Sequence, residues 1–206
     1  TKKYALNFSE KGYVVIYYDF CMSGSGQSTG SSVGMSVLTE KTDLINVLHY
    51  SQTLEFVDKD KIIFAGCSQG GFVSALAAVE CESEIEKLIM IYPALCIPDD
   101  ARRGQMIDAK FDPNNVPETF KCTFLTLGAR YALDVMKMDT NKEICKFKKP
   151  VLIVHGIEDK LVDIKYARSA AKDYPNCKLV EIHGDHGFNS EQSLADCKKA
   201  LFEFLD

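Results

Sequence analysis

A serine with small neighbours stands where a short β-rich run meets a helix-like run. The turn reads Gly66-Cys67-Ser68-Gln69-Gly70, between residues 61–65 and residues 71–79. A sharp turn from strand to helix exposes a serine hydroxyl, and its two glycines leave room for the close approach of strand and helix. The free N–H groups at the helix start point to where an oxyanion forms. We therefore predict that Ser68 is a nucleophile and that the backbone N–H of Gln69 binds the oxyanion.

The same spacing of glycine and serine occurs twice more, in one loop rich in both residues. Gly26-Gln27-Ser28-Thr29-Gly30 and Gly30-Ser31-Ser32-Val33-Gly34 both match it. Neither copy directly follows a strand-like run and directly precedes a helix-like run, so the composition of the loop explains both. The context of the motif favours Ser68.

A serine hydroxyl is a poor nucleophile at neutral pH, so it needs a base, and the base needs an acid to orient it. Residues that follow parallel strands meet at one edge of the sheet. Asp159 follows the strand-like run 151–155, and His186 follows the run 178–182. We predict that His186 is the base and that Asp159 orients it.

Nearby residues compete for these two roles. Glu158 and Asp163 flank Asp159, but Asp163 has the position of an N-cap for the next helix. His183 continues the strand, whereas His186 lies between two glycines in a loop that can bring its ring over the serine. The favoured chain order is serine, aspartate, histidine.

Strand-like and helix-like runs alternate along the chain, which predicts an α/β fold with a mostly parallel sheet and helices on both faces. The predicted helices are residues 1–9, 39–56, 71–80, 163–174 and 190–205, and the predicted strands are residues 13–18, 61–65, 87–92, 151–155 and 178–182. The length of 206 residues fits a single domain over residues 1–206.

Residues 96–148 interrupt this alternation. The segment is too long for a plain connection and contains three prolines and several aromatic residues. We predict that it is an inserted cap or lid. Its pair Arg102-Arg103 is suited either to an anionic substrate or to a solvated surface.

Composition excludes several classes of partner. The net charge is −5 with no block of like charges, which argues against nucleic acid, and no apolar run is long enough to cross a membrane. The eight cysteines are scattered without a C-x-x-C pair, so we expect no metal and no cofactor, and we expect reduced thiols in a cytoplasmic protein. The sequence does not indicate an oligomeric state.

The motifs together resemble the serine α/β-hydrolase superfamily, esterase type. The turn 66–71 is similar to the family's nucleophile elbow, His155-Gly156-x-x-Asp159 to its acid loop, and Gly184-x-His186-Gly187-Phe188 to its histidine loop. Residues 19–28 resemble the turn after its fourth strand. Residues 96–148 resemble, more weakly, the small cap of the cinnamoyl and feruloyl esterases.

One region of that superfamily has no counterpart in this sequence. The family places three strands and an oxyanion loop, usually opening with His-Gly, before the helix that begins this chain, whose first residue is Thr1. We therefore expect an N-terminal portion to be absent from this sequence. The sheet is then expected to start at residues 13–18 beside exposed apolar surface or an unpaired edge. The Gln69 N–H is expected to be one oxyanion donor where the family has two.

The resemblance implies hydrolysis of a carboxylic ester, a small acyl or aryl ester, through an acyl-enzyme intermediate. The same machinery also serves peptidases, thioesterases and lipases. A different class remains open as well, that of a hydrolase-fold protein that binds a ligand without catalysis. A small-molecule ester is the expected partner.

Overall fold

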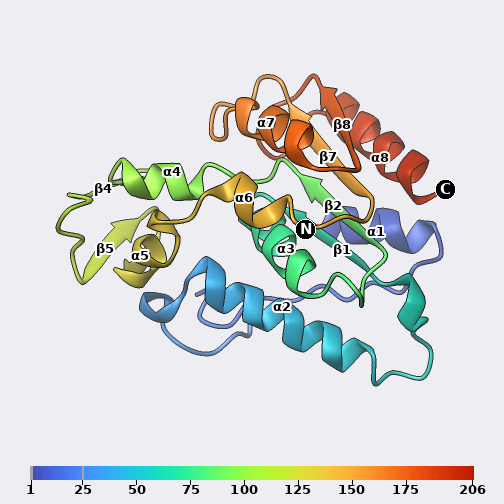
Figure 1. The fold of residues 1–206 in the computed structure, drawn as a ribbon, viewed down its shortest axis with the longest axis horizontal. Helices are drawn as coiled ribbons and strands as arrows, with labels where there is room; N and C mark the ends of the chain where they lie inside the picture. The colour runs from blue at the N-terminus through green and yellow to red at the C-terminus, as the bar shows by residue number, and fades with distance from the viewer. Residues whose placement is uncertain (1, 25) are drawn as a thin grey trace.

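The computed structural model describes residues 2–24 and 26–206, so Thr1 of the predicted first helix lies outside the described residues. The main sheet has four parallel strands in the order β1-β2-β7-β8 (Figure 1). These strands are β1 (Ile63–Cys67), β2 (Lys87–Ile91), β7 (Val151–Gly156) and β8 (Cys177–Ile182). Because all four run in the same direction, their carboxyl ends share one edge.

Helices cover both faces of this sheet, as predicted. The α-helices of the body are α1 (Lys2–Glu10), α2 (Val37–Ser51), α3 (Gln69–Glu80), α7 (Lys165–Asp173) and α8 (Glu191–Leu205), and the 3-10 helices are η1 (Ser32–Gly34) and η2 (Lys59–Lys61). Ile91 and Val154 pack on the face that holds α1 and α8, whereas Met90 and Ile153 pack on the face that holds α3 and α7. Strands buried on both faces explain the continuous apolar runs in the sequence.

The first predicted strand is wrong. Residues 13–18 are assigned to no strand, and Val14, Ile16 and Tyr17 are exposed. The sheet instead begins at β1, an edge strand whose Ala65 is exposed at its centre. A β-rich pattern forms a strand only where a neighbouring strand takes its hydrogen bonds, and no described strand pairs with this segment. The expected unpaired edge and exposed apolar side chains are therefore present, but at β1 and beside it.

The predicted insertion folds into short elements that lie to the left of the main sheet in Figure 1. They are α4 (Ile97–Arg102), β3 (Gln105–Met106), β4 (Ala109–Lys110), β5 (Thr119–Cys122), β6 (Leu125–Gly128), α5 (Arg130–Met136) and α6 (Thr140–Ile144). β3 pairs with β4 and β5 with β6, both antiparallel. Phe120, Leu127 and Phe147 belong to the same buried cluster as Phe72 of α3. The insertion therefore shares the core of the body. No helix among the described residues is long and apolar enough to span a membrane.

Gly66, near the end of β1, and Gly70, in the first turn of α3, differ in how closely other atoms approach them. A Cβ atom added to Gly66 would lie 2.1 Å from the carbonyl oxygen of Gly70, whereas one added to Gly70 would meet nothing within 4 Å. The prediction that both glycines are needed for room is thus wrong for Gly70. We expect Gly66→Ala to lower the free energy of unfolding by about 3 kcal/mol, because backbone must move.

Gly70→Ala is the matched control, and we expect it to leave stability unchanged or to raise it by up to about 1 kcal/mol, because alanine favours the helix. Urea unfolding of both variants measures the difference. Equal losses in the two variants would contradict this account of the turn.

Candidate active site

The turn between β1 and α3 holds Ser68 in a strained backbone conformation. Ser68 has φ 52° and ψ −123°, a region that residues with a side chain rarely adopt. Its N–H donates to the carbonyl of Ile91 at 3.0 Å, and its carbonyl accepts from the N–H of Ala94 at 2.9 Å. These bonds to the end of β2 and the residues after it hold the turn in place. Strain that is fixed in this way is typical of a site that presents a reactive side chain.

The structure brings the three predicted side chains together. Ser68 Oγ lies 2.9 Å from His186 Nε2, and His186 Nδ1 lies 2.7 Å from Asp159 Oδ2. The aspartate accepts only, so Nδ1 of His186 carries the proton and Nε2 accepts from the serine hydroxyl. Each residue follows a different strand, namely β1, β7 and β8, at the shared carboxyl edge. The arrangement is chemically able to remove the proton from Ser68.

The Asp159 carboxylate accepts hydrogen bonds from four donors. Oδ1 accepts the N–H groups of Leu161 and Val162, both at 2.9 Å, while Oδ2 faces His186 Nδ1 at 2.7 Å and His155 Nε2 at 3.2 Å. Burial raises the pKa of this carboxyl, but the hydrogen bonds from the two histidines and Val162 outweigh burial and hold the pKa well below its usual range. Asp159 is therefore ionised at neutral pH.

His155 is a site residue whose role the sequence did not predict, although it is the first residue of the motif His155-Gly156-x-x-Asp159. It is fully buried, and its Nε2 faces two acceptors, the carbonyl of Val162 at 3.0 Å and Asp159 Oδ2. Nε2 therefore carries the proton, and Nδ1 is buried without a partner among the described residues. Its position four residues before Asp159, at the end of a buried strand, was the available signal.

The ring of Tyr92 packs against the ring of His186. Its ring centroid lies 4.8 Å from that of His186 and 4.9 Å from that of Phe188, and Tyr92 is buried. Its backbone has φ 37°, a second strained position directly after β2. Packing of this kind restricts the orientation of the imidazole. Sequence reasoning missed Tyr92, although it follows a strand as the three predicted residues do.

The competing acid Glu158 joins the two loops instead of facing the serine. Its carboxylate accepts from the Gly184 N–H at 2.7 Å and lies 2.9 Å from His183 Nδ1. His183 is largely exposed. The pair connects the loop after β7 to the loop after β8, so it fixes the position of the loop that carries His186.

The competing acid Asp163 and the nearby acid Asp185 also bind their own loops. The expected N-cap role of Asp163 is wrong, because the N-cap of α7 is Ile164. Asp163 lies one residue earlier and accepts from the Lys165 N–H at 2.9 Å. Asp185 accepts from the Asn189 N–H at 3.0 Å and from its side-chain amide at 2.8 Å. Both carboxylates thus stabilise local turns.

The serines of the two other glycine–serine motifs have structural hydrogen bonds. Ser28 Oγ donates to the carbonyl of Asp19 at 2.8 Å, and Ser32 Oγ donates to the carbonyl of Thr126 at 2.6 Å. Neither hydroxyl has a histidine as its partner in these bonds. The second bond connects η1 to the insertion.

Gln69 is held by its side chain as well as by its place in α3. As the first residue of the helix, it has a backbone N–H with no acceptor in the preceding turn. Its Nε2 donates to Glu40 Oε2 at 2.6 Å, and its Oε1 accepts from the hydroxyl of Tyr131. Burial raises the pKa of Glu40 to about 7. The hydrogen bond from Gln69 acts to lower this pKa, and the nearby carboxylate of Asp43 acts to raise it. Sequence reasoning missed Glu40, although it precedes the apolar Leu48 by eight residues on the same helix face.

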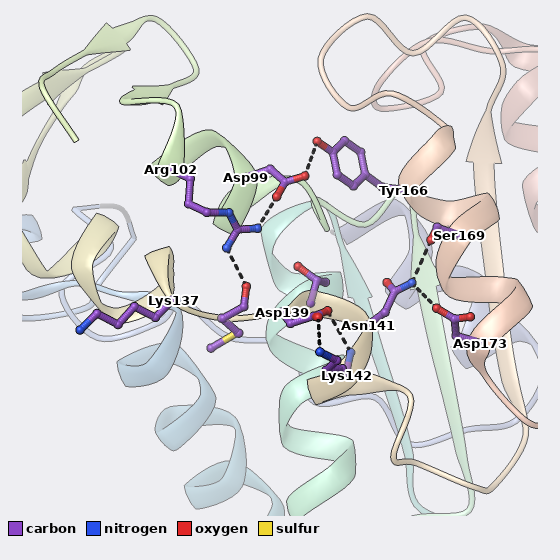
Figure 2. A pocket seen from close by; sticks show the side chains of 11 residues that line it. Asp99, Arg102, Lys137, Asp139, Asn141, Lys142, Tyr166, Ser169 and Asp173 are labelled. Carbon is purple, nitrogen blue, oxygen red and sulfur yellow. Dashed lines mark hydrogen bonds and ion pairs between the residues drawn. The ribbon is translucent and has the colours of Figure 1, made fainter. Parts of the chain in front are cut away.

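A polar cavity of about 710 Å³ lies between the insertion and α7 (Figure 2). Its lining residues are Asp99, Arg102, Lys137, Met138, Asp139, Thr140, Asn141, Lys142, Tyr166, Ser169 and Asp173. Arg102 pairs with Asp99 and donates to two backbone carbonyls at the end of α5, Tyr166 donates to Asp99 at 2.9 Å, and Asn141 donates to Asp173 at 2.6 Å. Arg102 is therefore not simply solvated, as one alternative held. The bonds of Tyr166 and Asn141 hold the insertion against α7, whereas those of Arg102 lie within the insertion.

The parallel sheet, the turn at Ser68 and the loops after β7 and β8 define an α/β-hydrolase of the esterase type. The profile described as acetyl xylan esterase (AXE1) matches residues 36–165, more than half of the chain. The chain belongs to this family, and it is a carboxylic ester hydrolase. No curated protein sequence matches the chain significantly.

Solved structures agree with this assignment. Est1E from Butyrivibrio proteoclasticus with ferulic acid bound is 34% identical at a TM-score of 0.83, and the match covers 90% of this chain and 74% of that one. A second structure of Est1E is 31% identical at a TM-score of 0.74, covering 83% and 72%. An α/β serine hydrolase homologue from Coxiella burnetii is 18% identical at a TM-score of 0.67, covering 100% and 75%, and shows the fold alone. The resemblance to the feruloyl esterase branch agrees with the ferulic acid in Est1E.

The depressed pKa of Asp159 predicts a specific dependence of stability on pH. As pH falls, the unfolded chain takes up a proton at an aspartate near pH 3.9, about its ordinary pKa, before the folded chain does. The stabilisation from Asp159 is therefore complete above about pH 5 and is lost as pH falls below that range. We expect Asp159→Asn to lower the free energy of unfolding most at neutral pH, and the difference from wild type to shrink in acid.

Urea unfolding at about pH 7, 5 and 3 measures this difference. Asp60→Asn is the control, because this residue is exposed and its carboxylate accepts no hydrogen bond among the described residues, and we expect a change within about 0.5 kcal/mol throughout. A loss from Asp159→Asn that is independent of pH would contradict the assignment of a stabilised anion.

Proposed function

We propose that this chain hydrolyses a small acyl or aryl ester through an acyl-enzyme on Ser68. His186 is the general base and acid, and Asp159 orients it. The observation that carries the proposal is the unbroken line of hydrogen bonds from Asp159 through His186 to Ser68. A carboxylate that orients a histidine beside a serine is the arrangement that activates a hydroxyl for acyl transfer.

The reaction has two halves. Ser68 Oγ bonds to the ester carbonyl carbon while its proton passes to His186 Nε2, and the carbonyl oxygen becomes an oxyanion that accepts from the Gln69 N–H. The bond to the alkoxy oxygen then breaks, and His186 returns the proton to the leaving alcohol. In the second half water attacks the acyl carbon and gives a proton to His186. Release of the acid returns that proton to Ser68 Oγ.

We also propose that residues 96–148 form a cap that sets substrate choice within the single hydrolase domain 1–206. The hydroxyl of Tyr131, in this segment, bonds to the side chain of Gln69, the residue next to Ser68. This contact supports a position of the segment beside the edge of the sheet where the substrate would bind. Ferulic acid bound to Est1E favours an aryl ester. The eight free cysteines favour the cytoplasm as its location.

Substitution of Ser68 and of His186 tests the mechanism. We expect Ser68→Ala and His186→Ala each to reduce kcat for aryl acetates by about 10⁴-fold or more, because either change removes the activated nucleophile. Steady-state kinetics on a panel of aryl and acyl esters, thioesters and peptides measures the loss and separates the esterase from a thioesterase or peptidase.

Ser28→Ala, Ser32→Ala and His183→Ala are the controls, and we expect each to keep activity within a few-fold of wild type. In His183→Ala the bond from the Gly184 N–H to Glu158 still joins the two loops. A fluorophosphonate probe should label wild type at Ser68 and leave Ser68→Ala unlabelled. Labelling at another serine would overturn the proposed nucleophile, and ester binding without turnover in wild type would favour a non-catalytic binding protein.

An exposed aromatic residue in the insertion tests the proposed cap. Phe124 is 85% exposed, so its side chain contributes little to the core. We expect Phe124→Ala to change the ratio of kcat/KM between a feruloyl and an acetyl ester by about 5-fold or more, with stability unchanged. Phe56→Ala is the control, since Phe56 is 67% exposed in the loop between α2 and η2, outside the insertion. Equal ratios in all three proteins would contradict a role for Phe124 in substrate choice.

A further inference from the structure

The side chain of Gln69 is bonded at both of its polar ends. Nε2 donates to Glu40 of α2 at 2.6 Å, and Oε1 accepts from the hydroxyl of Tyr131 of α5. Glu40 is 2% exposed and Tyr131 is 7% exposed. The half-buried amide of Gln69 thus has a buried partner on each side and one permitted orientation, because any rotation leaves a buried polar group unpaired.

This buried polar line is costly for the fold to maintain. Burial of a carboxyl group costs free energy unless its hydrogen bonds compensate, and apolar residues of similar volume pack without that cost. The cluster around the line is otherwise apolar, with Phe72 of α3 and Leu127 and Ala132 of the insertion among its members. A role beyond packing is therefore indicated for the polar residues at these three positions.

We propose that Glu40 and Tyr131 position Gln69 so that its backbone N–H meets the oxyanion, and that they thereby link the insertion to the nucleophile turn. This inference rests on the proposed function, in which that N–H is an oxyanion donor. Glu40 and Tyr131 are positioning residues, since they act through Gln69 and not on the substrate.

The position of Gln69 explains how a side chain affects its own N–H. The turn holds one end of the peptide between Ser68 and Gln69, because the Ser68 carbonyl accepts from the N–H groups of Gly71 at 3.0 Å and Ala94 at 2.9 Å. The other end of this peptide is the Cα of Gln69, which the turn does not hold in the same way. Two hydrogen bonds from opposite sides fix the side chain, and with it the Cα of Gln69 and the direction of its N–H. An oxyanion exists in the transition state and not in the bound ester, so the loss of this alignment lowers kcat and spares KM.

Four variants test the inference: Tyr131→Phe, Gln69→Leu, Glu40→Leu and Glu40→Gln. We expect Tyr131→Phe to lower kcat for p-nitrophenyl acetate by about 10-fold and Gln69→Leu and Glu40→Leu by about 10- to 100-fold, less than the loss of a whole donor, with KM within about 2-fold. Glu40→Gln keeps an acceptor for Gln69, so we expect it to retain most of kcat. The Ki of a trifluoromethyl ketone, whose serine adduct carries an oxyanion, should rise by the same factor as kcat/KM falls in each variant.

Two matched controls remove similar groups elsewhere. Tyr174→Phe removes a buried hydroxyl that has no partner among the described residues, and Gln52→Leu removes an amide that donates to Glu84 at 3.1 Å. We expect both to keep kcat and Ki within about 2-fold of wild type. Thermal unfolding of every variant accompanies the kinetics, and Tyr131→Phe, which keeps the aromatic ring, decides the question if a leucine variant does not fold.

The outcomes separate this inference from the proposed function. A wild type that is labelled at Ser68 and active, with Tyr131→Phe unchanged in kcat and Ki, would overturn the inference alone. Parallel increases in KM and losses of thermal stability with Ki unchanged would also overturn it, in favour of a purely structural role. A wild type that neither reacts with the probe nor hydrolyses esters would overturn both.

Discussion

The hydrogen bonds to the buried Asp159 carboxylate are the interaction on which the rest of the site depends. A charge in the interior must be compensated by donors, and here the donors come from its own loop, from His155 of β7 and from His186 of the loop after β8. Because His186 is one of these donors, the loop after β8 must close onto the loop after β7. The Glu158 bonds to His183 and Gly184 hold the same two loops together from the exposed side.

The parallel sheet makes this convergence possible. Ser68, Asp159 and His186 are far apart in the chain, yet each follows a strand whose carboxyl end lies at one edge. The insertion leaves the same edge after β2 and returns before β7, so it packs beside the site without disturbing the order of strands. Its apolar side chains join the core of the body, and its polar contacts reach Gln69 and α7.

The sequence predicts the elements and the site motifs because both depend on local patterns. Four of the five predicted strands form, since each has a neighbour in the sheet, whereas residues 13–18 have a strand's composition without a partner. Asp159 and His186 were recognisable from the loops that follow strands. The roles of His155, Tyr92 and Glu40 depend on which side chains meet in space, and a single sequence does not contain that information directly. From the sequence alone, Glu40 is expected to be an exposed acid on the surface of a helix. Its burial results from the packing of α2 on α3.

Two buried acids beside the nucleophile turn differ in pKa because they differ in the number of donors that reach them. Four donors reach Asp159, and its pKa lies below the usual range, while the one hydrogen bond from Gln69 leaves the pKa of Glu40 raised to about 7 by burial. Asp159 is therefore charged throughout the neutral range, as stabilisation of a protonated His186 requires. Glu40 changes charge within that range, which makes it unsuited to the same task. A carboxyl oxygen of Glu40 can accept from Gln69 whether the group is charged or neutral, and the positioning role requires only this hydrogen bond.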